Sequence, residues 1–198
     1  MRNSTLKICL VVSMVCSFAL AEGAFIGVES DYSFKSNLKM KFNDGGKDTF
    51  KKAQAGIGIK GGYDFDMYRV YGSYVYDFQT SKTIVDEDGD SLKLKWLTHK
   101  FIVGADYTPS ITDNFKLAVG PYTGYSRLKL KDSEGTKVNT NGWIIGAKLG
   151  GIYSIDKNNE LEFGFKTDIT DYKKVSKIDL KDVKETNYGL YIGYNYKF

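Results

Sequence analysis

Residue types that commonly perform catalysis are scarce in this chain. Among its 198 residues are one histidine, His99, and two cysteines, Cys9 and Cys16. A histidine that acts as a general base needs a nucleophile within hydrogen-bonding reach. The residue two positions after His99 is Phe101 rather than a serine. We therefore predict that His99 has no catalytic role, that the chain is not an enzyme, and that it needs no cofactor.

One acidic run superficially matches a calcium-binding loop. It is Asp86–Asp90, with the sequence DEDGD. Ser91 stands where such a loop has its invariant glycine, and Leu97 stands where it has its bidentate glutamate. An Asp-Gly turn at the tip of a solvated hairpin explains the run better, so we expect no metal site there.

The first 21 residues have the order of a cleaved secretory signal peptide. Two basic residues, Arg2 and Lys7, precede an apolar run from Ile8 to Leu20, and the segment ends in the small-x-small sequence Ala19–Ala21. The run is too short to cross a bilayer as a helix; a retained N-terminal anchor is the alternative. Both cysteines lie in this segment, so the mature chain would contain neither a disulfide nor a thiolate metal site.

The expected mature chain, residues 22–198, is one domain with nearly balanced charge. Removing Arg2 and Lys7 lowers the formal net charge from +4 to +2, which gives no indication of nucleic-acid binding. Glycine and tyrosine are abundant, with 21 and 15 copies, whereas proline occurs twice. Without a second long apolar stretch, this composition favours strands over membrane-spanning helices.

Apolar and polar residues alternate along the mature chain with the period of two that is typical of strands. Eight segments show the pattern: 24–34, 53–65, 68–78, 97–107, 115–125, 143–153, 161–169 and 187–198. The connections alternate as well, with short ones at 66–67, 108–114 and 156–159 and long ones at 35–52, 79–95, 127–141 and 171–184. Segments of about ten residues with short turns on one side predict an all-β fold, an eight-stranded antiparallel up-and-down transmembrane β-barrel.

Two features predict that the apolar face of this barrel points outward. The polar face is rich in glycine, which suits the narrow interior of an eight-stranded barrel. The aromatic residues of the apolar face fall into one group at the long-loop end (Phe34, Phe78, Tyr125, Trp143, Tyr188) and another at the short-turn end (Phe65, Tyr68, Tyr107, Phe115, Tyr153, Phe198). Two such girdles match the two interfaces of a membrane. A soluble lipocalin-like barrel, the alternative, has no reason to sort them.

The inward face carries charges of both signs. They are Glu29, Asp31, Asp77, Asp106, Glu162 and Asp168 among the acids, and Lys60, Arg69, Lys100, Lys116, Lys148, Lys166 and Lys197 among the bases. Because an unpaired buried charge is costly, we expect these residues to form an ion-pair network that fills the interior. A gated, narrow ion path through exchangeable pairs is the alternative.

The last residues carry a resemblance to a known family. Tyr194, Tyr196 and Phe198 occupy alternate outward positions and end in phenylalanine, which resembles the C-terminal signal read by the barrel assembly machinery. Together with the eight segments, this resembles the small outer-membrane β-barrels of the OmpA transmembrane-domain and OmpX type. The resemblance covers the whole mature chain and implies an integral location in the outer membrane of a Gram-negative bacterium. It leaves several functions open, because the family includes structural proteins, adhesins and narrow pores.

The long loops supply the remaining functional hypothesis. Alternation continues beyond the membrane segments in Leu38–Phe42, Leu92–Lys95 and Leu128–Lys131, which predicts hairpins above the bilayer. Exposed lysines can contact lipopolysaccharide phosphates, and strand edges can recruit an extended extracellular ligand. We therefore expect a structural or adhesin-like surface role. A low-conductance, porin-like channel is the second hypothesis, and a membrane-embedded lipid-modifying enzyme is the third.

Overall fold

A computed structural model describes residues 22–42, 47–85, 91–131, 137–174 and 180–198. The predicted signal peptide and the acidic run Asp86–Asp90 lie outside these residues. In the described part of the chain, no helix is long and apolar enough to cross a membrane.

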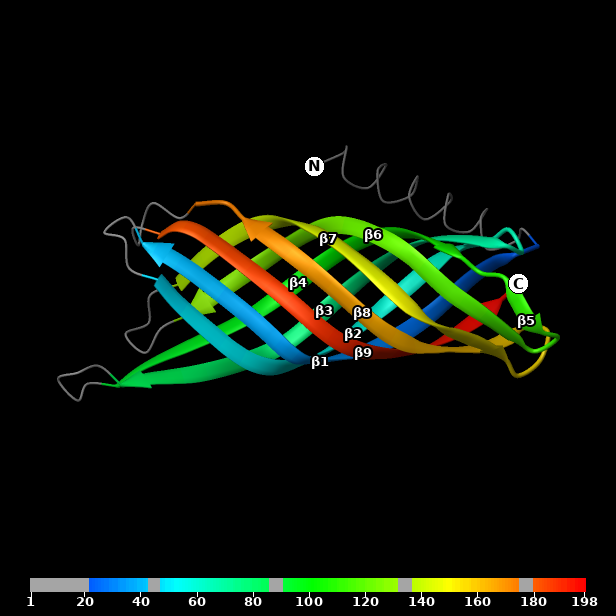
Figure 1. The fold of residues 1–198 in the computed structure, drawn as a ribbon, viewed down its shortest axis with the longest axis horizontal. Coiled ribbons are helices and arrows are strands. Elements are labelled where there is room, and N and C mark those ends of the chain that lie inside the picture. Colours follow the sequence, from blue (N-terminus) through cyan, green and yellow to red (C-terminus); the bar gives the residue numbers. More distant parts are fainter. Residues whose placement is uncertain (1–21, 43–46, 86–90, 132–136, 175–179) are drawn as a thin grey trace, which may run out of the picture.

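The described residues form one closed antiparallel sheet (Figure 1). Its strands are β1 (Ala24–Phe42), β2 (Lys47–Asp64), β3 (Tyr68–Val85), β4 (Ser91–Tyr107), β5 (Ser110–Thr112), β6 (Phe115–Lys131), β7 (Lys137–Ser154), β8 (Asn159–Tyr172) and β9 (Leu180–Lys197). Each long strand pairs with the next long strand along the chain, and β1 pairs with β9 to close the ring. The predicted eight-stranded up-and-down barrel is confirmed. The short strand β5 is an addition, a small hairpin with β6 inside a connection predicted as a turn.

The long strands exceed the predicted membrane segments, since they contain 14 to 19 residues. At about 3.3 Å per residue, an 18-residue strand is roughly 60 Å long, which at a tilt near 40° still exceeds an apolar band about 25 Å tall. The excess lies at the long-loop end, where the hairpins predicted from Leu38–Phe42, Leu92–Lys95 and Leu128–Lys131 are confirmed. We call these strand ends the loop-end extension: residues 35–42, 47–54, 79–85, 91–97, 126–131, 137–142, 170–172 and 180–187.

Pairing within the loop-end extension is not continuous around the ring. The ladder between β2 and β3 runs from Asp64 opposite Arg69 to Gly56 opposite Asp77. Beyond Gly56, β2 continues to Lys47 along β1, while β3 continues along β4 after a bulge that follows Asp77. Strand ends in this region therefore belong to two groups, one around β1 and one around β4.

Side-chain hydrogen bonds stabilise the tight turns at the opposite, short-turn end. Asp66 adopts a left-handed φ of 70°, which aspartate tolerates in turns, and its N–H donates to Asp64 Oδ1 at 2.9 Å. In the β7–β8 turn, Asp156 Oδ1 accepts the backbone N–H groups of Asn158 and Asn159 at 2.8 and 2.9 Å. Hydrogen bonds from the Asn158 backbone, and then from the Asn159 side chain, hold the pKa of Asp156 below its usual value.

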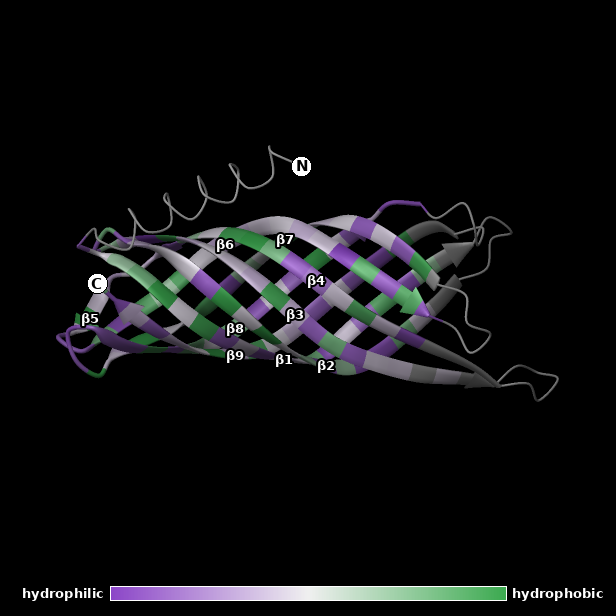
Figure 2. Cartoon of the chain, turned by 180° about the vertical axis from the view of Figure 1, so that it is seen from behind, coloured by the Kyte–Doolittle hydropathy of each residue, from purple (hydrophilic) through white to green (hydrophobic). Residues whose placement is uncertain are grey.

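The exterior of the barrel is apolar between the two aromatic girdles. Along the strands in Figure 2, hydrophobic and hydrophilic residues alternate. Ile59, Val103 and Ile145 on the outer face are 62%, 59% and 66% exposed. No aspartate, glutamate, lysine or arginine of the described chain points outward in this band. Exposing such a surface to water is unfavourable, whereas lipid hydrocarbon can cover it. Hydrocarbon also requires every backbone N–H and C=O group to be paired, and the closed ladder leaves no unpaired strand edge in this band.

Candidate functional site in the barrel interior and at the loop end

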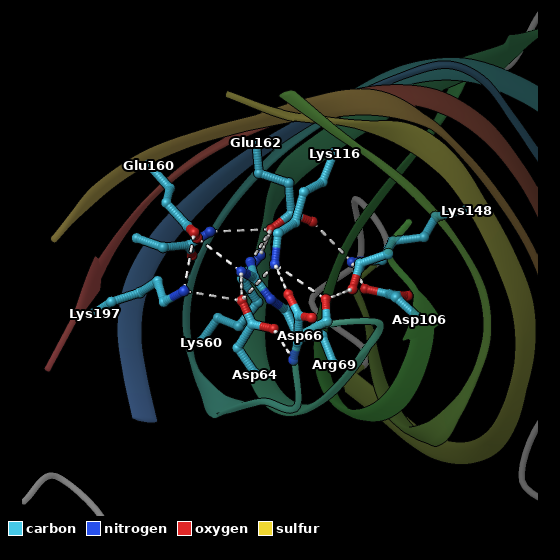
Figure 3. A network of polar contacts seen from close by, with 12 residues as sticks. Lys60, Asp64, Asp66, Arg69, Asp106, Lys116, Lys148, Glu160, Glu162 and Lys197 are labelled. Atoms are coloured by element: carbon cyan, nitrogen blue, oxygen red, sulfur yellow. Dashed lines mark hydrogen bonds and ion pairs between the residues drawn. The ribbon is translucent and has the colours of Figure 1, made fainter. Parts of the chain in front are cut away.

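Arg69 organises the charged layer nearest the short turns (Figure 3). Its Nη2 lies 2.8 Å from Asp64 Oδ2 and 2.8 Å from Glu160 Oε2, and its guanidinium carbon lies 4.6 Å from the centre of the Phe25 ring. Lys197 Nζ lies 3.1 Å from Asp64 and 3.6 Å from Glu160. The guanidinium is fully buried, and its carboxylate partners offset the cost of removing it from water.

Lys116 completes the layer at the turn. Its Nζ donates to the Asp66 carbonyl oxygen at 3.0 Å and lies 3.3 Å from Asp66 Oδ1 and 3.8 Å from Asp64 Oδ2.

Glu162 is the centre of the next layer. Lys60 Nζ donates to Oε2 at 2.5 Å, and Lys148 Nζ donates to Oε1 at 2.8 Å. Lys148 also lies 2.7 Å from Asp106 Oδ2, while Lys60 lies 3.9 Å from Glu29. Two amines therefore face three carboxylates at this level, and Arg69, whose Nη1 lies 3.9 Å from Glu162, supplies a further positive charge.

A third layer lies toward the loop end. Lys166 forms an ion pair with Asp31, and Lys100 Nζ lies 2.8 Å from Asp77 Oδ2. Asp168 was predicted to be part of the ion-pair network but has no ion pair within the described chain. Neutral donors bind it instead, since the Tyr122 hydroxyl and the Asn187 amide donate to it at 3.0 Å each.

Inward tyrosines fill the space between these layers, and inward glycines make room for them. Tyr71 pairs with Gly104 across β3 and β4, and Tyr122 pairs with Gly146 across β6 and β7. A Cβ atom added at Gly104 or Gly146 would lie 2.4 Å from the ring of its tyrosine. A residual cavity of about 20 Å³ borders Tyr71 and Tyr122, which is room for about one water molecule.

In the loop-end extension, the interior is apolar rather than charged. Nine buried side chains form an apolar cluster there: Leu38, Met40, Phe50, Trp96, Leu128, Leu130, Val138, Tyr172 and Val183. On the side of the cluster that faces the membrane segment, two hydroxyl groups bind the buried Glu185. The Tyr172 hydroxyl donates to its Oε2 at 2.7 Å, and Ser36 Oγ donates to its Oε1 at 3.0 Å. This part of the barrel is built like a soluble protein, with an apolar core and a polar outside.

The outside of the extension is strongly basic. Exposed or half-buried cations of the extension, and of the two residues that follow β8, are Lys35, Lys39, Lys51, Lys52, Lys95, Arg127, Lys129, Lys131, Lys173, Lys174 and Lys184. Asp171, 3.3 Å from Lys184, is an exposed acid at this end. The exposed charged residues of the short turns are three acids, Asp66, Asp113 and Asp156, and one base, Lys157.

His99 faces outward at the edge of the loop-end girdle. Its Nδ1 lies 2.7 Å from the Tyr74 hydroxyl, and its ring lies 5.2 Å from that of Tyr76. Arg127 is its cross-strand neighbour on β6. In the described chain, no set of three or more histidine, cysteine, aspartate and glutamate side chains could hold a metal ion.

Three interior acids were missed by sequence reasoning: Asp64, Glu160 and Glu185. All three are buried. Asp64 belongs to the polar face of its predicted segment, whereas Glu160 and Glu185 lie just before the predicted starts of theirs. Each stands two residues from another inward position, so continuing the alternation by one step would have found Glu160 and Glu185.

The C-terminal residues form part of the closing seam between β9 and β1. Phe198 N–H donates to the Ala24 carbonyl oxygen at 2.9 Å, and the Tyr194 hydroxyl donates to Asn159 on β8. Tyr194, Tyr196 and Phe198 all point outward and are 40%, 41% and 45% exposed.

No family model and no curated protein matches the sequence. Solved structures share its fold. Neisserial surface protein A is 19% identical, with a TM-score of 0.51 over 89% of this chain and 100% of its own. Outer membrane protein H (OprH) from P. aeruginosa is 24% identical, with a TM-score of 0.53 over 90% of this chain and 100% of its own. The chain therefore has the fold of the small outer-membrane β-barrels, and the resemblance drawn from sequence is confirmed for the fold. Together with the uncharged apolar exterior, this fold is that of an integral barrel of a bacterial outer membrane.

Proposed function

We propose that this chain is a sealed outer-membrane barrel that acts at the cell surface through its loop-end extension, and is neither a channel nor an enzyme. The observation that supports this function is the filling of the interior. Charged layers around Arg69, Glu162 and Lys100 occupy the membrane segment, and the apolar cluster around Trp96 follows at the loop end. An ion would have to separate buried pairs and then cross an apolar core, and both steps are costly.

The surface role is supported by the outside of the extension. Its excess of lysine and arginine lies next to the loop-end girdle, where anionic lipid headgroups and lipopolysaccharide phosphates are reached. The separate strand ends of β2 and β3 offer backbone groups to an extended extracellular ligand. During biogenesis, the outward Tyr194, Tyr196 and Phe198 would be read by the barrel assembly machinery.

A role without enzyme activity is supported by the surroundings of His99. The imidazole forms a hydrogen bond with the Tyr74 hydroxyl, and a phenol next to an imidazole lacks the activated nucleophile that acyl transfer requires. We assign His99 and Tyr74 to the loop-end girdle, where side chains with an apolar body and a polar tip are favoured.

Two measurements test this proposal. Purified protein in a planar bilayer should give no steady open-channel current, and such a current would reject the sealed interior. Cells that display the protein should lose binding to host surfaces or matrix when residues 42–50 are deleted, provided that the variant still assembles. Unchanged binding after that deletion would contradict the surface role of this hairpin.

A further inference from the structure

Two lysines face each other on the outside of the barrel where β4 pairs with β6. The ladder places Lys95 opposite Lys131, and Leu97 opposite Lys129. Trp96 and Leu130, the neighbours of these residues along the strands, are buried inside. The three lysines therefore project outward from one face. Directly opposite residues have Cβ atoms about 5 Å apart, and like charges at that distance destabilise a sheet.

The described chain supplies no acid to relieve this repulsion. None of Lys95, Lys129 and Lys131 has an ion-pair partner there. An outward lysine elsewhere in the extension does have an acidic partner: Lys184 on β9 lies 3.3 Å from Asp171 on the paired strand β8. A strand pair that keeps unbalanced like charges is favoured when an anion from outside the chain lies between them.

A groove of about 280 Å³ opens at the same place. Trp96, Leu97 and Leu130 form its apolar floor. Lys95, Lys129 and Lys131 line it together with Gln79 and Asn139, whose amides can donate hydrogen bonds. The donors in this lining come from four strands, β3, β4, β6 and β7. We call these five residues the cation groove.

The position of the groove identifies the source of the anion. Phe101, Tyr125 and Trp143 lie opposite one another on β4, β6 and β7 and form part of the loop-end girdle. Lys129 is two outward positions beyond Tyr125, on the same face of β6. A phosphate held at this height lies above hydrocarbon-facing residues, where the headgroup of a membrane lipid begins.

We propose that the cation groove binds the phosphate groups of an outer-leaflet glycolipid, the lipid A portion of lipopolysaccharide, while its acyl chains lie along the apolar exterior. This inference rests on the proposed surface role of the loop-end extension. Lys95 and Lys131 hold one phosphate between them, and Lys129 adds a second contact from the same face.

The test compares a groove variant with a charge-matched control. The groove variant is K95Q/K129Q/K131Q; the control, K39Q/K173Q/K174Q, removes three exposed lysines from β1 and from the two residues that follow β8. Each purified protein in zwitterionic micelles is titrated with bisphosphorylated lipid A, with the same lipid after removal of its phosphates, and with inorganic phosphate. Calorimetry gives the affinities, and backbone NMR shifts at Lys95 and Lys131 locate the site. Unchanged circular dichroism and urea midpoints confirm that the variants fold.

We expect the groove variant to bind bisphosphorylated lipid A at least tenfold more weakly than the parent protein and the control to stay within threefold of it. The dephosphorylated lipid and inorganic phosphate should bind far more weakly than the intact lipid. Equal losses in both variants would overturn the site, because general charge would then explain binding. Equal affinity for the dephosphorylated lipid would overturn the phosphate assignment, and tight binding of inorganic phosphate would overturn the lipid source. None of these results depends on whether the barrel conducts ions, so the sealed interior is judged separately.

Discussion

Lys60 on β2 and Glu162 on β8 are 102 residues apart in the chain, yet their side chains meet inside the barrel with Nζ 2.5 Å from Oε2. The two strands are not neighbours in the sheet, since β1 and β9 lie between them. This contact therefore crosses the interior and connects distant walls. Lys148 from β7 joins the same carboxylate, so removing Glu162 would leave two buried amines without their shared partner.

The first prediction concerns that carboxylate. Glu162→Gln should lower the free energy of unfolding by about 3–5 kcal/mol, because removing one partner leaves buried charges uncompensated. The control is Asp171→Asn, which breaks the exposed pair with Lys184 and should cost less than about 1 kcal/mol. Urea unfolding in micelles measures both. Equal effects of the two substitutions would show that the buried layer contributes no more than a surface pair.

The second prediction concerns the tyrosine–glycine pairs. Gly104→Ala places a methyl group 2.4 Å from the Tyr71 ring, and overpacking of this kind costs about 1–3 kcal/mol. Gly72→Ala is the matched control, because its new methyl group points outward and its nearest neighbour is 3.8 Å away. The difference in urea midpoint tests the pairing. If both variants unfold at the same urea concentration, the interior at Gly104 is looser than described.

The third prediction concerns the apolar cluster of the extension. Trp96 is 1% exposed, so Trp96→Ala should cost about 3–5 kcal/mol. Trp96→Phe should cost much less, because the described chain offers the indole N–H no hydrogen-bond acceptor. Thermal unfolding followed by near-ultraviolet circular dichroism distinguishes the two variants. A Phe variant as unstable as the Ala variant would mean that the N–H has a partner outside the described residues.

The fourth prediction concerns the Asp156 turn. Because hydrogen bonds lower the pKa of this carboxyl in the folded state, its contribution to stability is present above the unfolded value near 3.9. That contribution is lost as the pH falls through the lower, folded value. Carboxyl chemical shifts recorded during an acid titration should give a midpoint below 3.9 for Asp156. A midpoint at or above that value would remove the turn from the acid-sensitive elements of the fold.

The fifth prediction concerns His99. His99→Ala should leave the acyl chains of lipid A and phospholipids unchanged in cells that express the protein, because the imidazole contacts Tyr74 rather than an activated nucleophile. Mass spectrometry of extracted lipids, with an empty-vector control, gives the answer. Loss of acyl chains on expression of the parent protein, abolished in the variant, would restore the enzyme hypothesis.

Much of the fold could be predicted because a barrel strand alternates with period two. That pattern assigned Glu162 and Lys60 to the inside and Val103 to the outside without any knowledge of neighbours. The contact between Lys60 and Glu162 could not be predicted, because it depends on the stagger of strands around the ring and not on local sequence. Likewise, Asp168 faces inward as expected, but its register places it beside Tyr122 and Asn187 rather than a lysine.

Other features escaped prediction for different physical reasons. Glu160 and Glu185 lay beyond segment limits drawn at the aromatic girdles, although strands continue wherever hydrogen-bond partners continue. The β2–β3 ladder ends at Gly56 because β2 continues along β1 while β3 continues along β4. The alternation within one strand carries no information about which neighbour the strand pairs with. The lysine pair Lys95–Lys131 is visible only after the register of β4 and β6 is known.

The most direct test of the account is a spin-label scan of β4 in lipid vesicles. Single cysteines from residue 101 to 106 are introduced into purified protein that lacks the first 21 residues and so has no native cysteine. Labels at Phe101, Val103 and Ala105 should be relaxed by oxygen, which dissolves in lipid, and protected from a water-soluble nickel reagent. Cysteines at residues 102, 104 and 106 face the filled interior, where even a methyl group at Gly104 would clash with Tyr71, so they should react poorly with the label and stay shielded from both reagents. Strong relaxation of the Val103 label by the nickel reagent would contradict a lipid-covered exterior.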